Sequence, residues 1–248
     1  HTLALSRKVN NEYVSSPIAS GVLDSSSQYV TVLPYDSPDS IEYIRQHADE
    51  IAAVLVEPVQ SRQPNIQPKQ FLHDLRQLTK ELGLILIFDE MVNGFRIHQG
   101  GAQAWFNVEA DIVTYGKLLG SGLSIGVVTA RHQLMDYLDG GDWKFGDDSY
   151  PGHEATFFGG TFNQNPLTMT AVCAVLRHLR AQGPELQDRL NQKAQRLVDE
   201  VNTYLKTSEF PLHMVNFGTM MRFTMPGNNS YLYQPLEMDL FYAGMIFR

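Results

Sequence analysis

One lysine, Lys117, stands alone in an almost uncharged stretch, ADIVTYGKLLGSGLSIG, which covers residues 110–126. The apolar run before it is typical of a buried strand, and its nearest neighbours are aromatic, glycine and leucine residues. Poor hydration destabilises a charged ammonium group, so we expect a free amine near neutral pH, as a Schiff-base lysine requires. The glycines at positions 116, 120 and 122 would let a large ligand approach the backbone.

These glycines do not match two common nucleotide-binding motifs. Residues 120–122 with Gly126 resemble a dinucleotide-binding loop, but the spacing is wrong and no acidic ribose partner is apparent. A phosphate loop of the form G-x-x-x-x-G-K-[ST] needs serine or threonine after the lysine, whereas Leu118 follows Lys117. The lysine therefore needs a different partner.

Two further apolar runs end in an ionisable residue. In IAAVLVEPV (51–59) the apolar run reaches Glu57, and in LILIFDE (84–90) it reaches Asp89. Both runs are typical of strands covered on both faces. In parallel sheets, ligands bind beyond the carboxyl ends of the strands. Glu57, Asp89 and Lys117 would then share one site; the alternative is that each charge simply marks a strand entering solvent.

Asp89 suggests the chemistry of such a site. A carboxylate at the end of a buried strand is costly unless a cation pairs with it. The protonated ring nitrogen of pyridoxal 5'-phosphate (PLP) is such a cation, and PLP acts as an electron sink while an acid keeps that nitrogen protonated. Lys117 and Asp89 are thus the minimum set for PLP chemistry, although Asp89 could instead cap a turn or a helix.

The order of elements predicts an α/β fold with a mainly parallel sheet and helices on both faces. We expect loops before residue 40, apart from a short strand over 29–33, and again over 100–106 and 140–160. The part over residues 1–184 is predicted to be a large domain, and 185–248 a linking helix and the start of a small C-terminal α/β domain. Further strands are expected over 51–59, 84–88, 111–115, 125–130 and 213–223, and helices over 40–50, 68–83, 166–181, 184–205 and 235–247.

Composition excludes several classes of function. The 248 residues carry a formal net charge of −8 without a basic stripe, so neither nucleic acid nor an anionic membrane is an expected partner. Cys173 is the single cysteine, which excludes an internal disulfide; its apolar helical setting predicts a small core residue. The histidines lack metal-site spacing, and no signal peptide or long uncharged run is present, which favours a cytoplasmic protein.

Taken together, these stretches resemble the class III aminotransferases, which are PLP enzymes of fold type I. The resemblance implies a PLP-binding large domain with its N-terminal portion missing, followed by a truncated small domain. It covers most of the chain and rests on VLVEPVQS (54–61), LILIFDEMVNGFR (84–96), GGAQAWFNVEADIVTYGKLLGSGLSIGVV (100–128) and FFGGTFNQNPLTMTA (157–171).

The resemblance also implies roles for individual residues. Lys117 would bind PLP covalently, Asp89 would pair with the ring nitrogen, and Met91 would pack on one face of the ring. Thr161 would bind the cofactor phosphate in the partner subunit's site of a homodimer, and Glu57 would be a supporting acid.

Three positions bear on the substrate. Many class III members carry glutamine at the position of Val92, where it bonds the phenolic oxygen of the ring, and valine cannot do so. Arg62 stands where many amino-acid-specific members have an acidic residue. It would favour a carboxylate or a phosphate, such as a carrier's phosphopantetheine arm, or it is a surface arginine. Gln60 is the second candidate for substrate contact.

Three further segments, GFRIHQGGAQAWF, MDYLDGGDWKFGDDSYP and TFFGGTF, are similar to the aminotransferase domains of polyketide and nonribosomal-peptide synthases. This similarity implies transfer from an amino-acid donor to a β-keto acyl thioester on an acyl carrier protein. Glutamate-1-semialdehyde aminomutases are the next nearest relatives, so an aminomutase is one alternative. A non-catalytic scaffold domain of the same fold is another, because residues 1–40 lack the family's phosphate-cradling loop and its ring-stacking aromatic residue. We also expect a longer parent polypeptide, which leaves open whether this chain retains PLP.

Overall fold

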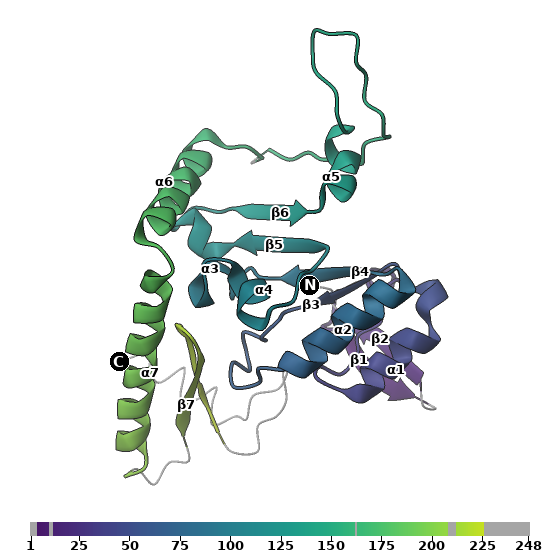
Figure 1. Cartoon of the computed structure of the whole chain (residues 1–248). Coiled ribbons are helices and arrows are strands. Elements are labelled where there is room, and N and C mark those ends of the chain that lie inside the picture. Colours follow the sequence, from purple (N-terminus) through teal and green to yellow (C-terminus); the bar gives the residue numbers. More distant parts are fainter. Residues whose placement is uncertain (1–3, 10–11, 162, 208–211, 226–248) are drawn as a thin grey trace.

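The computed structural model describes residues 4–9, 12–161, 163–207 and 212–225. Its centre is a four-stranded sheet in the order β3-β4-β5-β6, in which the first three strands are parallel and β6 is antiparallel to β5 (Figure 1). The predicted α/β fold with a mainly parallel sheet is confirmed. The strands are β3 (Ala53–Val56), β4 (Ile85–Asp89), β5 (Ile112–Gly116) and β6 (Gly126–Ala130).

The largest core cluster lies between α2 (Lys69–Leu82) and the sheet, and α1 (Pro38–Gln46) packs beside α2. Apolar residues recur in α2 at helical spacing and form one buried stripe, in which Leu72, Leu75 and Leu78 are almost fully buried. Burying each such side chain contributes about 1.5–3 kcal/mol before its entropy cost is counted. The helix ends at Gly83, which adopts a left-handed conformation.

Two short helices connect β4 to β5, where we expected a loop over residues 100–106. They are α3 (Gly94–Ile97) and α4 (Gly101–Phe106). The expectation was wrong because the two glycines that suggested a loop lie at the start of a short helix. Gly101 begins α4 at φ 72°, and Asn107 ends it in the left-handed region. A further helix, α5 (His132–Asp139), was not predicted.

Beyond α5, residues 140–165 contain no helix or strand among those described, in agreement with the predicted loop. In Figure 1 this loop first projects beyond α5 and then runs back across to α6. Helices α6 (Pro166–Gln182) and α7 (Glu185–Leu205) then follow one another along one flank of the sheet. The side chain of Asn165 caps α6 by accepting hydrogen bonds from the backbone N–H groups of residues 167 and 168. The hairpin of β7 (His213–Phe217) and β8 (Met220–Thr224) packs on α7.

Four further expectations fail in the structure. Where loops were expected over residues 4–9 and 12–17, the chain forms a hairpin of β1 (Ala4–Val9) and β2 (Glu12–Pro17), and residues 29–33 are not a strand. Strand β3 is covered on one face only, since the side chains alternate and Leu55 is 49% exposed. Cys173 is exposed on α6 and is not a core residue. The helix expected over 235–247 lies outside the described residues.

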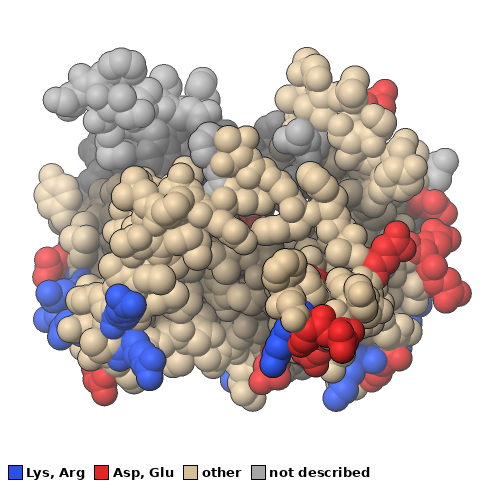
Figure 2. Space-filling model, turned by 90° about the horizontal axis from the view of Figure 1, so that it is seen from above, with Lys and Arg blue, Asp and Glu red and all other residues tan. Residues whose placement is uncertain are grey.

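The surface carries charges of both signs. In the face seen in Figure 2, Lys and Arg lie interspersed with Asp and Glu along the lower rim, while the middle consists of other residues. Within the described ranges, no helix combines the length and apolar character that spanning a membrane would require.

Candidate active site

The carboxyl ends of β3, β4 and β5 meet at one edge of the sheet, as the sequence predicted. The registers pair Val56 with Phe88 and Asp89 with Thr114, so Glu57 and Asp89 reach this edge side by side. Lys117 follows directly after Gly116, the last residue of β5. Three neighbouring strands therefore deliver two acids and one amine to the same edge.

Lys117 stands in a constrained turn. It opens the short 3₁₀ helix η3 (Lys117–Gly120) and has φ 44°, a left-handed conformation that lysine rarely adopts. Such a conformation costs about 1–2 kcal/mol and persists only where the surrounding structure imposes it. Gly116 explains part of the constraint, because a Cβ there would lie 2.4 Å from Met91 Cε and 2.8 Å from the Ile125 carbonyl oxygen. The turn is therefore pressed against the segment that follows Asp89.

The expectation of a poorly hydrated amine is wrong for this single chain, because Lys117 is exposed. Its apolar neighbours do not cover it. Leu119 is 3% exposed and belongs to the interior. An apolar sequence context thus predicts where the leucines go, and it says little about the hydration of the lysine between them.

Asp89, in contrast, is buried, with 6% of its surface exposed. One carboxylate oxygen, Oδ1, accepts hydrogen bonds from Met91 N at 3.0 Å and from Thr114 Oγ1 at 3.5 Å. The turn-capping alternative is therefore realised for this oxygen. The same bonds hold the carboxylate between β4 and β5, and β5 is the strand that ends just before Lys117.

The segment after β3 places its polar side chains differently. Glu57 is half-buried, and its Oε1 accepts a hydrogen bond from Ser61 N at 3.4 Å. The Gln60 side chain turns inward, and its buried Oε1 has no hydrogen-bond partner among the described residues. Arg62 is exposed. Of the two candidate substrate residues, Arg62 is therefore accessible from solvent, whereas the Gln60 Oε1 atom is enclosed by the fold.

Of the three other predicted residues, Met91 contacts the Lys117 turn, and Val92 and Thr161 lie on neighbouring segments of the chain. Met91 is half-buried and touches Gly116, whereas Val92 is half-buried on the chain segment that leads into α3. Thr161 is exposed in the segment before α6, a helix that packs against the Lys117 turn.

Sequence reasoning missed two residues at this edge. Tyr35 donates a hydrogen bond to the Pro58 carbonyl at 2.9 Å, and its pKa is raised first by burial and then by the charges of Asp36 and Glu57. Glu90 is buried with 1% exposed, and burial raises its pKa to about 7. The Asp-Glu pair after a buried strand was a usable signal for Glu90, because consecutive residues of a strand face opposite sides.

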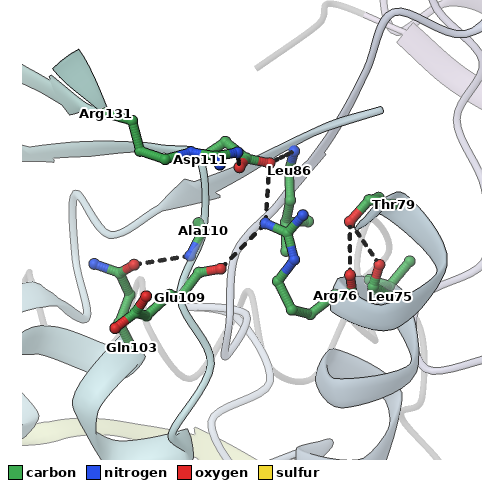
Figure 3. Close-up of polar contacts among 9 residues, drawn as sticks. All are labelled: Leu75, Arg76, Thr79, Leu86, Gln103, Glu109, Ala110, Asp111 and Arg131. Atoms are coloured by element: carbon green, nitrogen blue, oxygen red, sulfur yellow. Dashed lines mark hydrogen bonds and ion pairs between the residues drawn. The ribbon is translucent and has the colours of Figure 1, made fainter. Parts of the chain in front are cut away.

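A separate polar cluster fixes the other end of β5 (Figure 3). The buried Asp111 carboxylate accepts hydrogen bonds from Arg76 Nη1 at 2.9 Å and from Leu86 N at 2.8 Å, and it also pairs with Arg131. Burial lowers the pKa of Arg76. Beside this cluster lies a hollow of about 590 Å³, which Gln103 and Arg131 help to line. The cluster anchors the start of β5, and its role is structural.

The residues at the Lys117 edge fit PLP. A buried carboxylate suits a protonated ring nitrogen, and an exposed amine on a rigid turn suits an aldehyde. The glycine at 116 keeps the turn close to Met91, which provides an apolar contact. No group of three His, Cys, Asp or Glu residues that could hold a metal ion occurs within the ranges the structure describes.

Comparisons with known proteins show the family to which this chain belongs. The family described as "Aminotransferase class-III" matches residues 26–240. A glutamate-1-semialdehyde 2,1-aminomutase of Geobacillus kaustophilus is 34% identical over 209 residues, which are 84% of this chain and 45% of that protein. The chain therefore spans somewhat less than half the length of the curated relatives it matches.

Solved structures show the same fold. An omega-transaminase from Sphaerobacter thermophilus superposes with a TM-score of 0.78 at 29% identity, covering 95% of this chain and 52% of that one. A β-phenylalanine aminotransferase from Variovorax paradoxus gives a TM-score of 0.67 at 29% identity, covering 78% and 42% of the two chains.

Proposed function

We infer that this chain, which belongs to the class III aminotransferase family, transfers amino groups with PLP as its cofactor. One observation carries the proposal: the left-handed turn at Lys117 lies at the end of β5, beside the strand end that bears the buried Asp89. PLP, when bound, supplies an electron sink for charge that develops on the substrate carbon.

The chain's own residues would divide the remaining work. Asp89 would keep a proton on the ring nitrogen, and Lys117 would hold the cofactor covalently. Once released from the cofactor, the Lys117 amine would move a proton at the α carbon of the amino donor, as general base and then as general acid. Met91 and Val92 would contact the ring, and Glu57 would support Asp89 from the neighbouring strand end.

Two reactions are candidates, an aminomutase reaction and transamination of a carrier-bound thioester, and the comparisons favour the aminomutase. The relatives named as glutamate-1-semialdehyde aminomutases support an enzyme that moves an amino group within one small amino aldehyde. The second candidate is a β-keto acyl thioester on a carrier protein. It is supported by the synthase-like segments and by similarity to a β-phenylalanine aminotransferase, whose name denotes a β-amino substrate. Exposed Arg62 would contact either substrate, and Gln60 would do so after its buried side chain turns outward.

Dependence on an external amino donor separates these two candidates. The full chain would be supplied with PLP and either glutamate-1-semialdehyde alone, or a β-keto acyl thioester with and without an amino-acid donor. Product formation from the semialdehyde without any donor supports the aminomutase. Product that forms from the thioester only when the donor is present supports the transaminase. If neither substrate reacts and PLP is not retained, the scaffold alternative is correct.

We also propose that two copies of the chain share their active sites. Aromatic residues of the loop between α5 and α6 support this, since Phe145 is 98% and Phe157 93% exposed, and such side chains are common at interfaces. Thr161, at the end of the same loop, would then bind the cofactor phosphate of the partner subunit. Light scattering on a Phe145→Ser, Phe157→Ser double variant tests this: a monomer is expected where the wild type is a dimer.

A further inference from the structure

We propose that Glu90 is the positioning residue for the Lys117 turn: its buried carboxylate fixes α4 and, through Gln103 and Tyr115, the end of β5. This role rests on the proposed function, since it explains how Lys117 is held in place for the cofactor. Glu90 would contact neither the substrate nor the reacting atoms. Its role would therefore differ from that of Asp89, which would pair with the cofactor.

The Glu90 carboxylate uses both of its oxygens on backbone groups. Oε2 accepts a hydrogen bond from Ala102 N at 2.6 Å, and Oε1 accepts one from Gln103 N at 3.0 Å. The fit is close, because a Cβ at Gly101 would lie 2.3 Å from Oε2. Glu90 thereby binds the first turn of α4 to the end of β4.

Gln103 passes this constraint to the strand that carries Lys117. Its side-chain Nε2 lies 3.4 Å from the Tyr115 hydroxyl and donates to it, while its Oε1 accepts a hydrogen bond from Ala110 N at 2.9 Å. One side chain therefore contacts the chain both before β5 and near the end of β5. Tyr115 is two residues away from Lys117.

The Tyr115 ring packs against residues of α3. A Cβ at Gly94 would lie 3.2 Å from the Tyr115 ring, and the Phe95 ring lies 5.3 Å from it, centroid to centroid. Both belong to α3, which packs against α4 and against the η3 turn. Glu90 thus anchors α4, α4 packs against α3, and α3 in turn packs against the Lys117 turn.

A second, shorter connection runs through the backbone. Glu90 N donates a hydrogen bond to the Thr114 carbonyl at 3.0 Å, which ties residue 90 to β5. Residue 90 also lies between Asp89, whose carboxylate belongs to the site, and Met91, which presses on Gly116. A shift of Glu90 would therefore move groups on both sides of the Lys117 turn.

The chemistry explains why an acid is used here. A carboxylate offers two acceptor oxygens to two backbone N–H groups, whereas the glutamine amide of the same shape offers one acceptor and turns an NH₂ group toward the other N–H. Retaining a buried acid is costly, and burial raises the pKa of Glu90 to about 7. A purely apolar contact would avoid this cost, but it would leave the two N–H groups unpaired.

The test measures the bound cofactor as well as turnover. Glu90→Gln and Tyr115→Phe would be compared with two controls in the full chain, after loading with PLP. Asp111→Asn is the matched control, because it also alters a buried acid that accepts a backbone N–H, but at the opposite end of β5. Glu81→Gln alters an exposed acid on α2. The readouts are the dissociation constant for PLP and the pH midpoint of the visible absorbance of the bound cofactor.

We expect Glu90→Gln to weaken PLP binding roughly tenfold or more and to shift the pH midpoint, because misplacement of a reacting group by a fraction of an ångström is costly. Tyr115→Phe should shift the same midpoint by less. Both controls should leave the midpoint unchanged, even where Asp111→Asn lowers stability.

Two results would overturn the proposal in distinguishable ways. If Glu90→Gln matches the wild type in both readouts while Lys117→Ala loses the absorbance, the positioning role is wrong and the proposed function stands. If the wild type itself never binds PLP, both fall together. Should Glu90→Gln not fold, Tyr115→Phe and Gln103→Ala test the proposal instead. An unchanged pH midpoint in both variants would show that Glu90 does not position the turn through Gln103 and Tyr115.

Discussion

The buried acid Glu90 makes stability depend on pH in a direction that is unusual for a carboxyl group. Its pKa is raised from 4.5 to about 7 in the folded chain, chiefly by burial, so the folded state holds this proton more tightly than the unfolded state does. The contribution to stability is present in full below about pH 4.5 and is lost as the pH rises through about 7. Tyr115, the titratable group that interacts with Glu90, has a raised pKa and stays neutral throughout.

The size of this effect follows from the shift. Raising the pKa of Glu90 from 4.5 to about 7 corresponds to about 3 kcal/mol, most of which falls between pH 5 and pH 8. Glu90→Gln cannot titrate, although its mismatched amide costs a further, pH-independent 1–3 kcal/mol or so. The stability of the wild type minus that of the variant should therefore decrease by about 2–3 kcal/mol across this range.

Urea denaturation at half-unit pH steps measures this difference, because the histidines and the other groups that titrate in the same range are common to both proteins. Glu81→Gln serves as the exposed control and should give a flat difference curve. A Glu90→Gln difference curve that is also flat, to within about 0.5 kcal/mol, would show that Glu90 is ionised at little cost and would refute the linkage.

Three further changes test the packing around the site, all by urea denaturation. Gly116→Ala should lower the free energy of unfolding by about 1–3 kcal/mol, because its Cβ would overlap Met91 and the Ile125 carbonyl; an unchanged midpoint would show that the turn is loosely held. Asp111→Ala should cost about 3–5 kcal/mol, since it leaves Arg76 without its buried partner; a loss below about 1 kcal/mol would contradict this. Asn165→Ala should cost about 1 kcal/mol through loss of the α6 cap, whereas Asn165→Asp should retain most of the stability.

Periodic patterns predicted the parts of the fold that they describe. The apolar stripe of α2 and the apolar runs of β4 and β5 gave these elements to within a residue or two of their observed ends. The terminal charges of three parallel strands gave the edge at which Glu57, Asp89 and Lys117 lie. These predictions succeeded because one local pattern decides each of them.

The failures depend on contacts that no local pattern records. The hydration of Lys117 depends on which groups of the fold cover its side chain. Its neighbour Leu119 packs into the interior and does not cover it. Helix α4 is six residues long and is held by the distant Glu90 carboxylate, so its own sequence carries a weak helical signal. The early hairpin of β1 and β2 pairs short polar strands without an apolar alternation to reveal them.

The most direct test of the account is to identify the lysine that binds PLP. The full chain would be incubated with PLP, reduced with borohydride to fix any bond between lysine and aldehyde, and digested for mass spectrometry. The account predicts a pyridoxyl phosphate label on the peptide that contains Lys117 and no label on that peptide in Lys117→Ala. A chain that binds PLP tightly but carries the label on another lysine, or on none, would contradict it.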